Sequence, residues 1–275
     1  MDYIELNIPV ADARQGEIVT AYLSDFPFES FSEESGILKA YIPKNALVDC
    51  KGEVDSVLHG LDIHGQTYIE IETQNWNELW ESNFPPVEVD GRCTIRAPFS
   101  PKPAEGLDIV IMPKMSFGTG HHATTWLMTA ELLDRDLSGL DGLDMGSGTG
   151  VLSIVAVKRG ARHVDAVDID EWAYDNCIEN ISVNDTVDSI TPILGDATVI
   201  EGRHYDFILA NINRNVLLAD MPRYAASLSA GGELIMSGFL ERDIQAVSDG
   251  ADKNGFTVTG TRLRDGWATV SCRKR

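Results

Sequence analysis

The chain has 275 residues, of which 43% are hydrophobic, and a formal net charge of −21. This length allows two domains with ordinary cores. The negative charge argues against the phosphate backbone of a nucleic acid as the main partner and suits a basic protein. The sequence holds no run of 18 apolar residues, no signal peptide at its start and no C-x-x-C pair among its four cysteines. We therefore expect a cytoplasmic protein without a membrane span, a direct nucleic-acid contact or a metal site.

Residues 1–73 predict a small α+β domain. Alternating apolar residues are typical of strands, and apolar residues at helical spacing are typical of helices. The predicted elements are strands at 3–8, 26–31, 37–42 and 67–73 and helices at 12–23 and 45–59. The resulting order β-α-β-β-α-β is the ferredoxin-like split arrangement. It carries no catalytic constellation in its sequence.

Residues 74–86 are expected to form a linker helix between two domains. Three bulky side chains repeat at i, i+3 and i+4 before a pair of prolines, namely Trp76, Leu79 and Trp80 before Pro85 and Pro86. Proline ends a helix, so the segment should be short and amphipathic. Its aromatic face is expected to pack on one of the domains or to act as a hinge between them.

Residues 87–275 predict a second domain in which strands alternate with helices. A hairpin over 87–97, with Asp90-Gly91 at its turn, and a second hairpin at the end of the chain flank this pattern. The other predicted elements are strands at 107–112, 163–168, 190–194, 205–210 and 233–236, helices at 126–133, 151–159, 171–184, 215–228 and 242–254, and terminal strands at 256–263 and 267–272. We expect the helix over 215–228 to break near Pro222, and 137–142 to be a loop. Such alternation indicates an α/β fold with a mostly parallel sheet covered on both faces.

The stretch 143–150 organises this second domain. A short strand breaks into alternating glycines at Gly146, Gly148 and Gly150, and an apolar helix follows. Strand, glycine turn and helix present backbone N–H groups to a polar or anionic ligand, and glycine permits the close approach. Val151 stands where a dinucleotide fingerprint needs its third glycine, which counts against a nicotinamide cofactor.

Polar residues follow several predicted strands of this sheet, namely Asp144, Asp168, Asp196 and Asn211. Ligands of parallel sheets bind outside the carboxyl ends of the strands. These side chains should therefore ring one crevice, with Asp168 placed where a ribose-binding acid belongs. Asp144 has two interpretations of equal weight, because an acid there can contact the cofactor or cap the N–H groups of the following loop.

Residues 117–125 read Phe-Gly-Thr-Gly-His-His-Ala-Thr-Thr and precede a predicted helix. Glycines and threonines at a helix start predict a polar pocket wall with accessible backbone groups. Adjacent histidines do not face one ligand on a helix, so His121 and His122 are not interpreted as a metal pair. Thr124 and Thr125 could equally cap the helix.

The sequence D-x-G-x-G-x-G with Asp168 at the end of the next strand resembles the S-adenosylmethionine site of class I methyltransferases. Together with Phe-Gly-Thr-Gly-His-His-x-Thr-Thr and Asn211, it makes nearly the whole chain similar to the ribosomal protein L11 methyltransferase (PrmA) family. Ala123 stands where that family usually has proline. The resemblance implies a Rossmann-like methyltransferase domain, S-adenosylmethionine as cofactor, a monomer, and an N-terminal domain that recognises basic ribosomal protein L11 for methylation of lysine and N-terminal amines.

By similarity, a set of residues from four segments would contact the cofactor: Phe117, Gly118, Thr119, Gly120, His122, Thr125, Asp144, Gly146, Gly148, Gly150, Asp168, Ile169, Asp196, Ala197 and Asn211. Residues 117–120 would close over it, and Asp196-Ala197 would hold the adenine edge. Asn211 is the candidate catalytic residue, because its carbonyl oxygen could orient the acceptor amine. Binding the methionine end of the cofactor is an equally open role for it.

Two alternatives remain. A methyltransferase could act on another protein or on RNA, although the acidic charge and Asn211-Ile212-Asn213-Arg214, in place of Asn-Pro-Pro-aromatic, count against a nucleic-acid base. A module could also bind S-adenosylmethionine without turnover, but the glycines and Asp168 that such a module could lose are intact.

Overall fold

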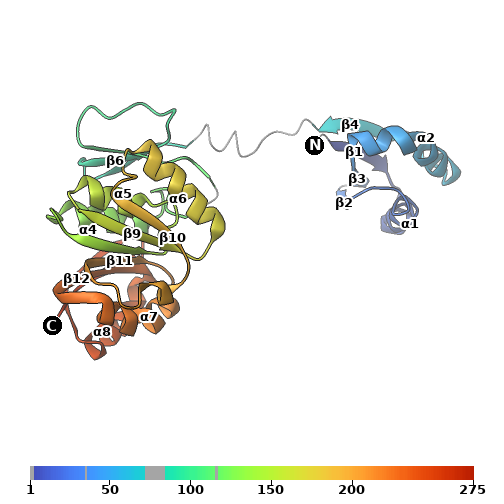
Figure 1. The fold of residues 1–275 in the computed structure, drawn as a ribbon. Coiled ribbons are helices and arrows are strands. Elements are labelled where there is room, and N and C mark those ends of the chain that lie inside the picture. Colours follow the sequence, from blue (N-terminus) through green and yellow to red (C-terminus); the bar gives the residue numbers. More distant parts are fainter. Residues whose placement is uncertain (1–2, 35, 72–83, 115–116) are drawn as a thin grey trace. The chain divides into compact units, whose positions relative to one another are not determined.

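The computed structural model describes residues 3–34, 36–71, 84–114 and 117–275, and its contacts divide the chain into one unit of residues 1–79 and another of residues 80–275. Figure 1 shows the elements of both units. The linker helix predicted around Trp76, Leu79 and Trp80 lies outside the described residues.

The first unit is an antiparallel sheet with two helices. Its strands are β1 (Tyr3–Pro9), β2 (Ser30–Glu34), β3 (Ile37–Pro43) and β4 (Thr67–Ile71), in the order β2-β3-β1-β4, and its helices are α1 (Ala13–Leu23) and α2 (Lys44–Gly60). Leu6 and Ile8 of β1 form a buried core with residues of both helices. The hairpin strand β2 begins at Ser30, not at Phe26 as predicted, because Phe26 and Phe28 pack against this core instead.

The second unit is built on a seven-stranded sheet of order β10-β9-β8-β11-β12-β14-β13. The first five strands are parallel and the last two antiparallel, so the predicted α/β class with a terminal hairpin is confirmed. The strands are β8 (Asp141–Met145), β9 (His163–Asp168), β10 (Ile190–Leu194), β11 (Tyr205–Asn211), β12 (Leu228–Leu240), β13 (Phe256–Arg264) and β14 (Trp267–Lys274).

Helices cover this sheet on both faces because alternate residues of the central strands point to opposite sides. One face packs against α4 (Ala123–Leu133), α5 (Val151–Lys158) and α6 (Glu171–Val183), and the other against α7 (Arg214–Ser227) and α8 (Ile244–Lys253). In β11, Phe207 and Leu209 belong to the first core, while Ile208 and Ala210 belong to the second. Short 3-10 helices at Ala197–Ile200 and Glu241–Asp243 complete the unit.

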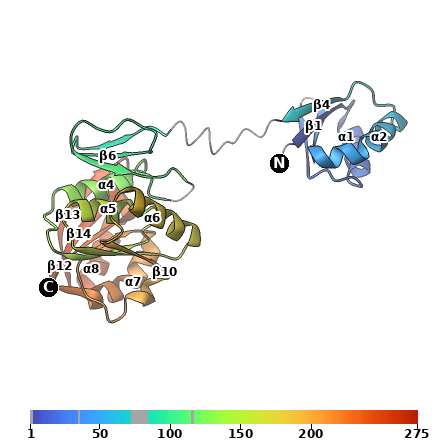
Figure 2. The same ribbon diagram turned by 45° about the horizontal axis from the view of Figure 1, so that its top comes forward.

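A small sheet of β5 (Val87–Val89), β6 (Cys93–Arg96) and β7 (Leu107–Val110) joins the core formed with α4 and α5 (Figure 2). The predicted hairpin turn is present. Asp90 and Gly91 have left-handed φ values of 51° and 64°, and the Arg92 N–H donates to the Val89 carbonyl across the turn at 3.0 Å. β6 and β7 pair in parallel, which leaves β7 at the edge of the small sheet.

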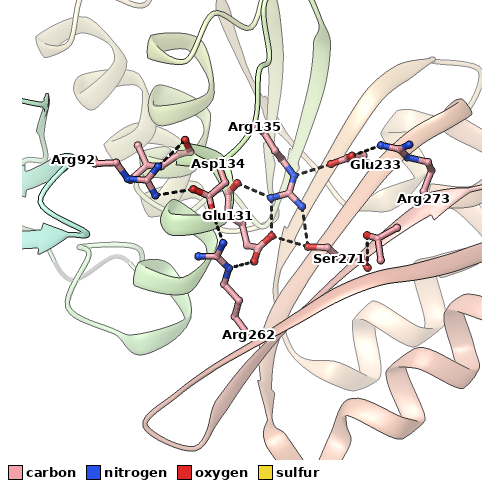
Figure 3. A network of polar contacts seen from close by, with 10 residues as sticks. Arg92, Glu131, Asp134, Arg135, Glu233, Arg262, Ser271 and Arg273 are labelled. Atoms are coloured by element: carbon pink, nitrogen blue, oxygen red, sulfur yellow. Dashed lines mark hydrogen bonds and ion pairs between the residues drawn. The ribbon is translucent and has the colours of Figure 1, made fainter.

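A network of ion pairs joins the end of α4 to the terminal hairpin (Figure 3). Glu131 is buried and accepts from the arginine side chains of Arg135, at 2.6 Å, and Arg262, at 2.5 Å, and from the Ser271 hydroxyl at 2.9 Å. Arg135 also donates to Glu233 at 2.7 Å. Hydrogen-bonded pairs of this kind fix the geometry of the groups they join.

Three local predictions were wrong. α7 continues through Pro222 without a break, because the flanking Met221 and Tyr224 are buried in the core and hold the helix despite the missing N–H. β8 begins at Asp141, inside the predicted loop, since it pairs with β9 and β11 on both sides. β12 begins at Leu228, which pairs with Tyr205 before the Gly231-Gly232 step.

Candidate functional site

A cleft of about 640 Å³ opens where the parallel strands of the large sheet end. β8 has β9 on one side and β11 on the other, and this reversal of strand order is where open α/β sheets bind ligands. Eight of the predicted site residues line the cleft: Phe117, Gly146, Gly148, Asp168, Ile169, Asp196, Ala197 and Asn211. The structure thus brings together side chains that lie almost a hundred positions apart in the sequence.

The glycine loop, residues 146–150, connects β8 to α5 through left-handed backbone. Gly146, Gly148 and Gly150 have φ of 73°, 54° and 76°. A Cβ at Gly146 would lie 2.2 Å from Ile212 Cγ2, and one at Gly148 would lie 2.3 Å from the Phe117 carbonyl oxygen. Only glycine fits this path, so the loop brings bare backbone to the wall of the cleft.

Asp168 holds the glycine loop from the neighbouring strand. Its Oδ2 accepts from the Gly148 N–H at 2.8 Å, and its Oδ1 accepts from the Asp170 N–H at 3.0 Å. A carboxylate has about four acceptor positions, so two backbone bonds leave capacity for ligand hydroxyls. The position at the end of β9 is suited to a ribose diol.

Asn211 ends β11 and is 8% exposed. Its Oδ1 is buried and has no hydrogen-bond partner within the described chain. A buried polar atom without a partner costs free energy, so such an atom on a cleft wall indicates a ligand group that completes it.

Asp196, Ala197 and Ile169 form the outer part of the cleft. Asp196 accepts from the Thr198 N–H at 2.9 Å and from the Thr198 hydroxyl at 2.6 Å, and these bonds lower the pKa of its carboxyl group. Ala197 is buried, whereas Ile169 is 76% exposed at the mouth. An exposed large apolar side chain beside a cleft suits a flat ligand such as a nucleobase.

Segment 117–125 is fastened to the glycine loop. The Thr149 N–H donates to the Phe117 carbonyl at 2.9 Å, and the Thr149 hydroxyl donates to the Gly118 carbonyl at 2.7 Å. Phe117 lines the cleft, but the rest of this predicted group does not, namely Gly118, Thr119, Gly120, His122 and Thr125.

His122 caps α4, because its Nδ1 accepts from the Thr124 N–H at 3.3 Å, and burial lowers the pKa of its imidazole. Thr125 is fully buried in the first turn of α4. Its Oγ1 is another polar atom without a partner within the described chain.

Asp144 and Gly150 lie behind the cleft wall rather than on it. Asp144 Oδ2 accepts from the Ser153 N–H at 3.0 Å and from the Ser153 hydroxyl at 2.7 Å, which ties β8 to the first turn of α5. Burial raises the pKa of Asp144 to about 6. Asp144 therefore caps the start of α5, whereas the capping interpretation had placed its partners in the loop that precedes this helix.

Ten further residues complete the cleft wall: Met145, Val167, Asp170, Trp172, Ala173, Gly195, Ile212, Asn213, Val216 and Asp220. Trp172 is 83% exposed, so it is a wall residue rather than core. Five of the ten adjoin a predicted site residue in sequence, namely Met145, Val167, Asp170, Gly195 and Ile212. The other five do not, and for Val216 and Asp220 of α7 their spacing of one helical turn was the only signal in the sequence.

Among the residues that the structure describes, no three histidine, cysteine, aspartate or glutamate side chains are grouped so that they could hold a metal ion. No helix in the described part of the chain is both long enough and apolar enough to cross a membrane.

Comparison with known proteins identifies close relatives over nearly the full length. Residues 11–275 match the family model described as ribosomal protein L11 methyltransferase (PrmA). The protein of that name from Bacteroides thetaiotaomicron is 43% identical over 98% of this chain and 99% of its own length, and that from Porphyromonas gingivalis is 43% identical over 92% and 89%. A crystal structure of ribosomal protein L11 methylase from Lactobacillus delbrueckii subsp. bulgaricus, 24% identical, superimposes with a TM-score of 0.62 over 69% of this chain and 99% of that one.

Proposed function

Because the chain belongs to the ribosomal protein L11 methyltransferase family, we propose that it transfers methyl groups from S-adenosylmethionine to lysine side-chain and N-terminal amines of ribosomal protein L11. The observation that carries the proposal is the buried Asn211 oxygen, which has no partner within the described chain and belongs to a residue that lines the same cleft as the glycine loop. The same cleft therefore holds both a hydrogen-bond acceptor for an amine N–H, supplied by Asn211, and a binding site for the cofactor, supplied by the glycine loop.

The described residues fit the cofactor. Asp168 keeps acceptor capacity for ribose hydroxyls, Asp196 and Ala197 line the cleft and would hold the adenine edge, and the glycine loop allows backbone approach. S-adenosylmethionine, when bound, supplies an electrophilic methyl group on a sulfonium. Thr125, His122 and residues 118–120 do not line the cleft. We propose that they act on the cofactor indirectly, by positioning the backbone of the segment that carries Phe117.

The task of this chain is to orient a neutral amine. Methyl transfer is an in-line displacement, so positioning supplies most of the rate enhancement. A lysine ammonium, with a free pKa of about 10.4, must first lose a proton because it has no lone pair. Desolvation in the cleft lowers that pKa, and the Asn211 carbonyl then accepts one amine N–H and directs the lone pair toward the methyl group. Solvent water can take the released proton.

The partner is proposed from charge as well as from family. Residues 1–73 hold 14 acidic and 4 basic side chains, which favours attraction of a basic protein surface. We assign substrate recognition to this unit, the linker role to residues 74–86 and methyl transfer to residues 87–275. A monomer in the cytoplasm, where ribosomal proteins are modified, without direct nucleic-acid or membrane contact, completes the proposal.

The test is mass spectrometry of purified ribosomal protein L11 incubated with this protein and S-adenosylmethionine. Mass gains in steps of about 14 Da on lysine or the N-terminus are expected, one for each transferred methyl group. Binding of S-adenosylhomocysteine, measured by calorimetry on the same preparation, is the control. Binding without any gain on L11, alongside gain on another protein or on RNA, would overturn the substrate.

A further inference from the structure

Three asparagines form a buried stripe along α6 and its C-cap, outside the cleft. Asn176, Asn180 and Asn184 are spaced by four residues, so they share one helix face, and they are 1%, 0% and 4% exposed. Three buried carboxamides on one helix require partners elsewhere in the fold. Asn180 and Asn184 find theirs in backbone groups of two other segments, whereas Asn176 accepts only from Asn180 and its Nδ2 has no partner within the described chain.

Asn184 binds the free edge of β7. Its Oδ1 accepts from the Val110 N–H at 2.9 Å, and its Nδ2 donates to the Val110 carbonyl at 2.6 Å. The helix side chain thus takes the place of a further strand beside β7. Stabilising the edge of β7 is therefore a sufficient reason for Asn184 to be buried.

Asn180, one turn earlier, joins two segments. Its Oδ1 accepts from the Met112 N–H at 2.8 Å, just beyond β7, while its Nδ2 donates to the Thr149 carbonyl at 2.9 Å. The same amide donates to Asn176 Oδ1 at 2.5 Å, which fixes its orientation. Asn180 is therefore the asparagine of this stripe that reaches the glycine loop.

Thr149 is the centre of the local hydrogen bonding. Its N–H and hydroxyl hold the carbonyls of Phe117 and Gly118, and its own carbonyl is held by Asn180. Its neighbours Gly148 and Gly150 are both left-handed glycines, which have the greatest backbone freedom when unfastened. A loop that is ordered only when ligand binds weakens affinity by the entropy of ordering.

We infer that Asn180 is a positioning residue that holds the glycine loop and Phe117 in their binding geometry before the cofactor arrives. The inference rests on the proposed function only in that this cleft binds the cofactor. It assigns Asn180 no contact with substrate or cofactor. Asn180 acts on the cleft through its hydrogen bond to the Thr149 carbonyl. Asn184 is also buried, but its side chain bonds to the edge strand β7 and makes no contact with the glycine loop.

The experiment compares Asn180→Ala with the matched control Asn184→Ala. Calorimetry gives the dissociation constant of S-adenosylhomocysteine, and thermal unfolding gives Tm. Both variants should lower Tm by similar amounts, because each leaves a partly buried backbone N–H at or just beyond β7 without its acceptor. N180A should weaken binding about tenfold, the change expected from one buried hydrogen bond, and N184A by less than about twofold. With S-adenosylmethionine and L11, the cofactor KM of N180A should rise more than its kcat falls.

Asn180→Asp separates the two contacts and keeps the test decisive if N180A does not fold. The carboxylate has the same shape and still accepts from the Met112 N–H. In its ionised form, which an assay at about pH 9 favours, it has no proton to donate to the Thr149 carbonyl or to Asn176 Oδ1. N180D should therefore weaken binding as N180A does. Wild-type affinity in N180D or N180A, or equal loss in N184A, would overturn the inference. Failure of the wild-type protein to bind S-adenosylhomocysteine would instead contradict the proposed function.

Discussion

The acidic side chains near the two ends of the parallel strands are bonded differently. We call the carboxyl ends of the strands, which line the cleft, the open edge, and the opposite ends, with Glu131 and Glu233, the paired edge. At the edge where the parallel strands end, Asp168 accepts from two backbone N–H groups and Asp196 from Thr198. Toward the opposite edge, Glu131 and Glu233 are each bonded to arginines (Figure 3). The first arrangement leaves acceptor positions for a ligand, whereas the second uses them within the protein.

Helix α4 connects the two regions. His122 caps its start, just after the segment whose Phe117 and Gly118 carbonyls are bonded to the glycine loop, and Glu131 lies in its last turn. The ion pairs of the paired edge therefore hold α4 and the sheet in place, and the residues of the open edge depend on that arrangement to form the cleft. Changes at the paired edge should alter stability more than activity. Loss of a side chain at the open edge should do the reverse where that side chain has no partner within the described chain.

Glu131→Ala should have the largest effect. Removing it leaves Arg135 and Arg262 without a shared buried partner, and loss of one member of a buried pair costs about 3–5 kcal/mol of unfolding free energy. Urea unfolding measures this. The exposed Glu53→Ala is the control, with a change within about 0.5 kcal/mol. S-adenosylhomocysteine affinity of folded E131A should stay near wild type, and a stability loss below that of E53A would refute the structural role.

Asn211→Ala tests the open edge. Loss of the orienting carbonyl should lower kcat about 100-fold, while the unfolding free energy changes by no more than about 1 kcal/mol because no hydrogen bond of Oδ1 is lost.

Asn213→Ala is its counterpart on the same wall. Asn213 caps α7 through the Asn215 N–H at 2.9 Å, so this variant should lose about 1 kcal/mol of stability and keep its kcat. Wild-type kcat in N211A would remove Asn211 from the mechanism.

Asp144 gives a pH-dependent effect that is smaller than that of Glu131→Ala. Its folded pKa of about 6 lies above the ordinary 3.8, so the folded state binds the proton more tightly and stability falls as pH rises between those values. Asp144→Asn removes this pH-dependent contribution to the unfolding free energy. The unfolding free energy of D144N relative to wild type should rise by about 2–3 kcal/mol from pH 4 to pH 7. A difference that stays constant with pH would show that the Asp144 pKa is not raised.

The sequence predicted this fold well because its signals are local. Alternation in β9 and β11, glycines 146–150 and the Asp90-Gly91 turn each dictate their own geometry. The predictions were wrong where tertiary contacts determine the local structure. Pro222 stays within α7 because the core holds this helix, and Asp141 belongs to a strand because β8 pairs with β9 and β11.

The same distinction applies to the cleft. Its acids and glycines could be recognised from their places after strands, whereas Val216 and Asp220 required knowledge of which face of α7 turns to the cleft. The role of Asn180 required the contacts that bring α6, Met112 and Thr149 together. No pattern within α6 alone distinguishes Asn180 from Asn184.

Hydrogen–deuterium exchange with and without S-adenosylhomocysteine tests the central claim most directly, because it compares both edges in one measurement. The account predicts slower exchange on ligand addition in the glycine loop and around Asp168 and Asp196, with little change around Glu131 and Glu233. Protection confined to the arginine-paired edge, or none in the glycine loop under saturating ligand, would contradict it.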